Sequence, residues 1–88
     1  MTTSTEKLKY LLVEVIWTDA EECGSVGWND PEETLAESKV DCPTVHSVGY
    51  VLHDSESHIS LIRSYHDNGM SSVEKIPKGF IRLIRALL

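Results

Sequence analysis

The chain has 88 residues, of which 41% are hydrophobic and 25% are charged. This length supports one globular domain with a thin core and excludes two independently folded units. Because a thin core leaves much apolar surface in water, we expect copies of the chain to associate as a homo-oligomer.

The net charge of −6 is divided unevenly between the two parts of the chain. Residues 1–56 carry −9 and residues 57–88 carry +3. The acidic balance disfavours nucleic acid as a partner. The last third nevertheless holds a set of basic residues that either forms a local cationic surface or neutralises the acidic part; the set is Arg63, Lys75, Lys78, Arg82 and Arg85.

The sequence contains no apolar run long enough to cross a membrane and no apolar segment typical of an export signal near residue 1. We therefore expect a cytoplasmic protein that binds no membrane. In that compartment Cys23 and Cys42 are expected to stay as reduced thiols. We predict a flexible N-terminal tail over residues 1–8 and a single β-barrel domain over residues 9–88.

Residues 9–17 predict the first strand. Their apolar side chains alternate and include β-branched and aromatic types, which favours a strand over a helix. Both faces of this strand are largely apolar, so we expect it to be covered on both sides or to lie at an interface. The polar residues 18–29, which include Gly24 and Gly27, predict a surface loop.

Asp30 begins the clearest local signal in the chain. Its carboxylate can cap a helix, Pro31 suits the first helical position, and Glu33 lies where a capping box places an acid. We predict a short helix from Pro31 to about Ser38. The acids of its first turn complement the helix dipole, and this interpretation is preferred over a metal or catalytic cluster.

The second half of the chain predicts four further strands. Residues 45–53 form a strand in which Val48, Tyr50 and Leu52 share one face, a polar turn follows at residues 54–57, and residues 58–65 return as a second strand. Residues 66–69 predict another turn or loop. Residues 72–76 form a short strand, and residues 77–79 break it. Residues 80–84 then form the closing strand, with a helix over residues 79–88 as the alternative.

The order of elements from residue 45 to residue 83 resembles the core of Sm-like and SH3-like barrels: strand, tight turn, strand, loop, short strand, one-turn break and closing strand. The resemblance implies a mostly β fold, a small five-stranded barrel with one short inserted helix. Sm-like proteins usually form rings and often bind RNA, so RNA binding is a third functional alternative.

A second resemblance covers nearly the whole chain. Its pattern is Val15-x-Trp17-x-Asp19, then Trp28, then VHSVGY over residues 45–50, then IPK over residues 76–78. This pattern is similar to that of small proteins encoded by bacterial viruses and prophages. The resemblance implies a viral accessory protein that acts in the cytoplasm of a bacterial host.

The residue types that carry catalysis do not form a convincing constellation. Cys42 and His46 suit a nucleophile pair, and His53 and His58 with Asp54 suit a metal site. In each case we prefer the interpretation that these are ordinary residues of strands and turns. We therefore predict a protein that is not an enzyme and has no catalytic residue, metal or cofactor.

The candidate ligand site combines aromatic and basic side chains. Two indoles can stack on a planar ligand while a basic group meets its phosphate. The residues assigned to it are Trp17, Trp28, Tyr50, Arg63 and Lys78. In the alternative, structural interpretation, Trp17 anchors the core and Trp28 packs at the entrance of the helix.

The function predicted first is a non-enzymatic viral accessory module that binds a small anionic, nucleotide-like ligand, as an oligomer that sequesters it in the host. The main alternative is an adaptor that binds a host or viral protein or takes part in virion assembly. In that case the acids Glu32, Glu33 and Glu37 would contact a basic partner.

Overall fold

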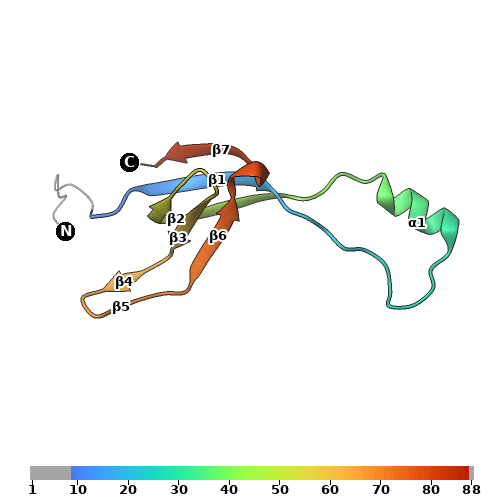
Figure 1. The fold of residues 1–88 in the computed structure, drawn as a ribbon, viewed down its shortest axis with the longest axis horizontal. Coiled ribbons are helices and arrows are strands. Elements are labelled where there is room, and N and C mark those ends of the chain that lie inside the picture. The colour runs from blue at the N-terminus through green and yellow to red at the C-terminus, as the bar shows by residue number, and fades with distance from the viewer. Residues whose placement is uncertain (1–8, 88) are drawn as a thin grey trace, which may run out of the picture.

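The structure is a computed structural model, and it describes residues 9–87. Its centre is an antiparallel five-stranded sheet with the strand order β6-β3-β2-β1-β7. Figure 1 shows these strands gathered at one end of the molecule. Their bounds are β1 Leu12–Thr18, β2 Thr44–Asp54, β3 His58–Ile62, β6 Val73–Pro77 and β7 Ile81–Ala86.

Three smaller elements complete the described part of the chain. The helix α1 (Pro31–Ser38) lies between β1 and β2 in sequence. The two-residue strands β4 (Tyr65–His66) and β5 (Gly69–Met70) form a separate hairpin between β3 and β6. A single 3-10 turn, η1 (Lys78–Phe80), joins β6 to β7.

Strand β2 belongs to both halves of a bent sheet. Its residues 44–50 pair with β1, and its residues 50–54 pair with β3. Gly49 lies where the halves meet, and a Cβ atom there would come within 2.8 Å of the carbonyl oxygen of Ile62. Only glycine allows this approach of one backbone to another. Strands β3 and β6 consequently run steeply across the direction of β1 and β7 (Figure 1).

The core lies between the two halves of the sheet. Its fully buried members come from β1, β3 and β6, and they are Val13, Val15, Ile59, Leu61 and Ile76. Trp17 packs against this cluster, and its indole Nε1 donates a hydrogen bond of 3.0 Å to Ser47 Oγ. A buried indole generally needs such an acceptor for its N–H group. The position of Trp17 against the core agrees with its alternative, structural interpretation.

The sheet is open, so the prediction of a closed barrel is wrong. Within residues 9–87 no strand pairing joins β6 to β7, which form the two edges. The reason is that η1 connects β6 and β7 at one end only. Away from η1 the two strands diverge, because β7 lies along β1 whereas β6 extends toward the β4–β5 hairpin (Figure 1). The mostly β class and the five-stranded sheet are confirmed.

Most predicted elements have the expected type. The helix has its predicted bounds, and the closing strand is confirmed as β7, so the alternative of a C-terminal helix is wrong. The predicted strand 58–65 is too long, because β3 ends at Ile62 and the chain bends at Arg63 before the β4–β5 hairpin. The tail predicted over residues 1–8 lies outside the described residues.

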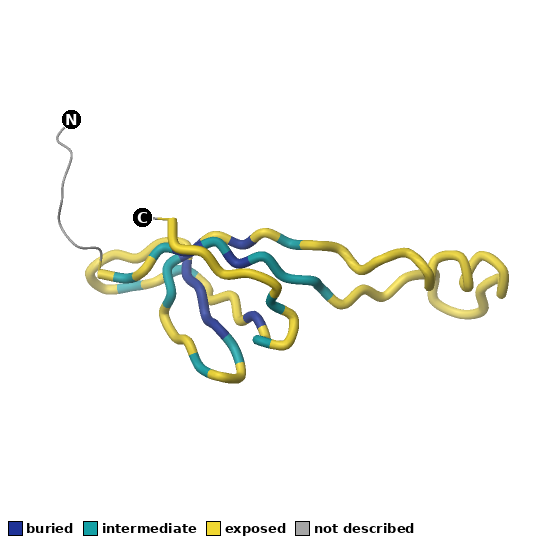
Figure 2. The backbone as a smooth tube through the Cα atoms, turned by 90° about the horizontal axis from the view of Figure 1, so that it is seen from above, coloured by how far each residue is buried: buried dark blue, intermediate teal, exposed yellow. Residues whose placement is uncertain are grey.

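Between β1 and β2 the chain leaves the sheet as a long arm, which we define as residues 19–43. The radius of gyration of the molecule is 18.2 Å, whereas a compact chain of this length has about 12 Å. Figure 2 shows the arm as exposed beyond Asp19, over residues 20–43. The protein therefore consists of a small folded body and a projecting arm that carries α1.

No helix among the described residues is long and apolar enough to span a membrane.

Candidate functional site

The arm begins as a continuation of the β1–β2 pairing. The amide of Asp19 donates to the carbonyl oxygen of Pro43 over 3.0 Å, and this is the last backbone hydrogen bond recorded between the two sides of the arm. Beyond it, residues 20–42 bury no side chain. The sheet therefore fixes where the arm starts, while the rest of the arm is held by local interactions.

The loop before α1 is ordered by Asn29. Its Oδ1 accepts hydrogen bonds from the amide and the hydroxyl of Ser25, at 3.2 and 3.0 Å, and its Nδ2 donates to the Ser25 carbonyl over 3.0 Å. Gly24 and Gly27 have φ values of +96° and +103°, which side chains other than glycine rarely adopt. The loop thus has a defined shape although it packs against nothing.

This loop presents Trp28 to solvent. The side chain is 102% exposed, so the prediction that Trp28 packs at the helix entrance is wrong. Val26 in the same loop and Leu35 and Val40 beyond it are also exposed. An indole held on an ordered loop loses little conformational freedom on binding, and tryptophan is the residue type most enriched at the centres of interfaces.

The helix α1 follows this loop and is likewise exposed. Asp30 Oδ2 accepts a hydrogen bond of 3.1 Å from the Glu33 amide, as the capping signal predicts. None of its residues is buried. An isolated helix of eight residues is marginal in water, so its cap and its neighbours in the arm carry its stability.

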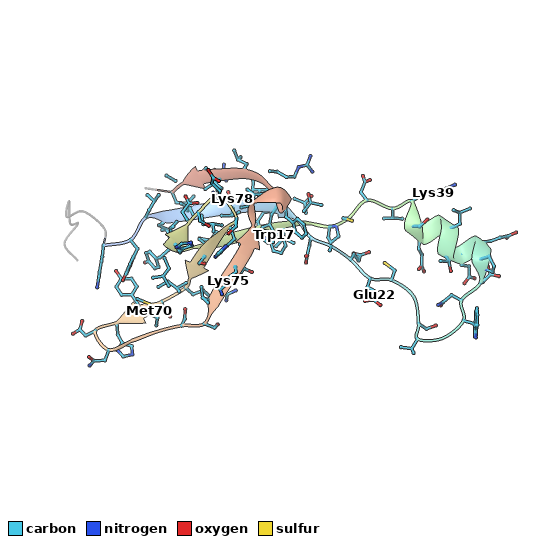
Figure 3. All side chains as sticks on the ribbon, viewed as in Figure 1. Trp17, Glu22, Lys39, Met70, Lys75 and Lys78 are labelled. Carbon is cyan, nitrogen blue, oxygen red and sulfur yellow. The ribbon has the colours of Figure 1, made fainter. Side chains whose placement is uncertain are left out.

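The arm is strongly acidic. It contains eight acidic residues and Lys39 as its single basic residue, which gives −7, whereas the rest of the chain carries +1. Figure 3 shows Glu22 and Lys39 on its two sides. Its acidic members are Asp19, Glu21, Glu22, Asp30, Glu32, Glu33, Glu37 and Asp41.

Both cysteines lie in the arm and are free, as expected for reduced thiols. They line a shallow hollow of about 260 Å³ together with residues of α1. The thiol of Cys23 donates a hydrogen bond to Glu21 Oε1, and this hydrogen bond raises the pKa of Cys23. A raised pKa makes a thiol a poorer nucleophile at neutral pH.

The five residues of the predicted ligand site do not converge on one place. Trp17 is half-buried and packs against the core, while Tyr50 packs edge-on against Tyr65 with ring centroids 5.4 Å apart. Lys78 forms an ion pair of 2.6 Å with Asp54, and Trp28 lies in the arm. Figure 3 shows Trp17 and Lys78 at the sheet.

Arg63 lines a hollow in the body. The hollow is about 470 Å³ in volume and lies where the first half of β2 separates from β3 and β6. Its polar lining includes His46, Ser72 and Glu74, and its apolar lining includes Val48. Of the five residues of the predicted ligand site, Arg63 is the one that lines this hollow.

The histidines near the β2–β3 turn lie close together, as the turn predicts. The rings of His53 and His58 are 5.1 Å apart between centroids. Among residues 9–87, however, no group of three or more His, Cys, Asp or Glu side chains is placed to hold a metal ion.

The surface of β1 opposite the core holds a further charged cluster that sequence patterns did not indicate. Glu14 accepts hydrogen bonds from His46 on β2 and from Arg85 on β7. The hydrogen bond from His46 lowers the pKa of Glu14, and Arg85 adds to this effect. Because these residues are 32 and 71 positions apart from Glu14, only the strand register brings them together.

Comparison with protein families, with curated proteins and with solved structures finds no match to this chain. The resemblances to Sm-like and SH3-like barrels and to small viral proteins therefore stay predictions.

Proposed function

We propose that the protein is a non-enzymatic interaction module that binds a basic protein partner through its acidic arm. The observation that carries this proposal is the fully exposed Trp28 on an ordered loop of an arm that buries nothing in its own chain. Apolar side chains held in water at a defined position gain free energy when a partner covers them. The surrounding charge of −7 selects a basic partner and speeds its approach.

The adaptor alternative from the sequence is thereby preferred over ligand sequestration. In a bacterial virus such a module would join a second protein, of the host or of the virion, to the body of this one. The acids Glu32 and Glu33 lie at the start of α1, close in sequence to Trp28, so one contact surface would contain both the apolar anchor and the charges.

The test is co-purification from the bacterial cells in which the protein acts. Tagged wild-type protein is compared with the variant Trp28→Ala, Glu32→Ala, Glu33→Ala, and with the control Glu56→Ala, Asp67→Ala, which removes two acids from turns of the body. We expect the same protein to be captured by the wild type and the control but not by the arm variant. Capture should also weaken as salt is raised. Equal capture by all three proteins would contradict the proposal.

Binding of a small anionic ligand is the second candidate, and the hollow beside Arg63 favours it. No acidic side chain forms an ion pair with Arg63 among the described residues, so its charge is available to an anion. Calorimetry with cyclic nucleotides and ADP-ribose derivatives tests this candidate. Heat that disappears in Arg63→Ala would support it, and the absence of heat with the wild type would remove it.

RNA binding is the third candidate function, because the −7 charge of the arm repels the phosphates of RNA. A gel shift at low salt tests it, since a phosphate-binding surface is strongest there.

A further inference from the structure

The two edges of the sheet differ in how they expose their backbone. In an antiparallel ladder successive residues point their N–H and C=O groups alternately to the two sides of the strand. The amide of Leu87 donates to the Leu12 carbonyl over 3.0 Å, so Leu83, Arg85 and Leu87 face β1. Ile84 and Ala86 consequently point their backbone groups away from the sheet.

The free edge of β7 is weakly protected against pairing around Ile84 and Ala86, because neither of these outward-facing residues is charged or a proline. It has no proline, and its one irregularity lies at its start, where the register with β1 shifts beside Arg82. Besides Arg82 and Arg85, it exposes an apolar side chain on each face, with Leu83 50% and Ile84 37% exposed. An exposed edge of this kind is a template for another strand. Figure 1 shows β7 along the margin of the sheet, with no further strand of residues 9–87 beyond it.

The opposite edge, β6, is protected. The amide of Lys78 donates to the Ser57 carbonyl over 2.9 Å, so Glu74 and Ile76 face β3, and Lys75 and Pro77 face outward. Pro77 has no N–H group to offer, and a lysine on an edge disfavours pairing. The two edges are therefore unequal, and β7 is the one that remains available.

The sequence of β7 is compatible with antiparallel pairing to itself. Consider a two-fold axis that passes between the Ile84 residues of two copies. The backbone N–H of each Ile84 then donates a hydrogen bond to the carbonyl oxygen of the other. In this register Leu83 lies opposite Arg85 of the second copy. An axis at Arg85 would instead place two guanidinium groups opposite each other, which is destabilising. In the Ile84 register no like charges are paired, and the Arg85 side chains are each neutralised by Glu14 of their own chain.

The charge distribution also selects the body as the contact surface. Each body carries +1 and each arm −7, so two copies that meet through their bodies keep the strongly repelling arms apart. The antiparallel arrangement places the two arms at opposite ends, because both project from the same end of β1 in their own copy.

We propose that two copies of this chain form a symmetric dimer by pairing their β7 strands edge to edge around Ile84, which joins the two sheets into one of ten strands. The dimer presents one acidic arm at each end. This inference goes beyond the proposed function, because it concerns the body and holds whether or not the arm binds a partner.

Sedimentation of the full chain over a range of concentrations tests the proposal. We expect a monomer–dimer equilibrium whose dissociation constant rises at least about tenfold in Ile84→Lys, where two like charges would face each other across the axis. Val73→Lys is the matched control, since Val73 is 44% exposed on the protected edge β6, and it should leave the constant unchanged. Wild-type protein that stays monomeric, or that forms only larger assemblies, would overturn the proposal.

Amide hydrogen exchange keeps the test decisive if Ile84→Lys fails to fold. In the wild type the amides of Ile84 and Ala86 should exchange more slowly as protein concentration rises, while those of Leu83 and Arg85 are protected at every concentration by β1. Rates at Ile84 and Ala86 that do not depend on concentration would contradict β7 pairing. The arm variant of the preceding section should dimerise normally, and loss of its dimer would show that the arm is the contact.

Discussion

Glu14 shows how one residue links three strands on the surface opposite the core. Its side chain is 14% exposed, whereas those of its partners His46 and Arg85 are mostly exposed. The carboxylate accepts both hydrogen bonds only when it is ionised, and for this reason the pKa of Glu14 lies below its ordinary value of 4.5. The ionised form therefore stabilises the pairing of β1 with β2 and β7.

This arrangement predicts a dependence of stability on pH. A carboxyl group with a lowered pKa in the folded state contributes stability above its unfolded pKa and loses it as the pH falls through its folded pKa. We expect the urea midpoint of the wild type to fall as the pH drops below 4.5, and Glu14→Gln to remove part of this fall while lowering the midpoint at pH 7. Glu56→Gln, in the polar turn, is the control. A pH profile of Glu14→Gln that parallels the wild type would contradict the role of Glu14.

Gly49 gives a second prediction at the scale of a residue. A Cβ atom there would lie 2.8 Å from the Ile62 carbonyl oxygen and 3.0 Å from Leu61 Cβ, so β2 and β3 must move apart in Gly49→Ala. We expect a loss of about 1–3 kcal/mol in the free energy of unfolding, measured by urea titration. Gly79→Ala, which has no neighbouring atom within 4 Å, should change it by less than about 0.5 kcal/mol. Equal effects of the two substitutions would contradict the close approach.

At the scale of an element, α1 is capped but does not pack on the core. Asp30→Ala removes the hydrogen bond to the Glu33 amide, and a lost cap costs a helix about 0.5–2 kcal/mol. Because α1 buries none of its residues, we expect this variant to lose helix locally while its global unfolding midpoint stays that of the wild type. Chemical shifts of residues 31–38 measure the local loss of helix, and urea titration measures the global unfolding midpoint. A lowered global midpoint would show that α1 supports the sheet.

The elements that were predicted well are those whose signals are local. Asp30 and Pro31 define the start of α1 within two residues, and the polar turn at residues 54–57 needs no distant partner. The end of β3 and the open sheet depend on which strands meet, and no local pattern shows that. The exposure of Val48 has the same origin, because β2 buries its other face, with Ser47 and Gly49, against the core.

The candidate site was predicted less well for a related reason. The sequence contains the acidic residues and Trp28, and it predicts a polar loop, but it does not show that the loop and helix leave the body. Aromatic residues are usually needed in a core as small as this one, which favours a buried role for both indoles. Only the structure separates Trp17, which packs on the core, from Trp28, which meets solvent.

At the scale of the whole molecule, the body and the arm are energetically separate. The buried core comes from β1, β3 and β6 and receives nothing from residues 20–42. Stability of the body should therefore not depend on the arm, whereas binding to a partner should.

Replacement of residues 20–42 by Asn-Gly tests this separation. The pairing of Thr18 with Thr44 and the hydrogen bond from Asp19 to Pro43 place the two ends side by side, and Asn-Gly suits a tight connection between paired strands. We expect the shortened chain to keep the urea midpoint of the wild type. Its monomer should have a radius of gyration near 11 Å by small-angle scattering at low concentration, against 18.2 Å for the full chain. A full-length monomer that already scatters as a compact particle would mean that the arm folds onto the body in solution. A shortened chain that unfolds would mean that the arm contributes to the core.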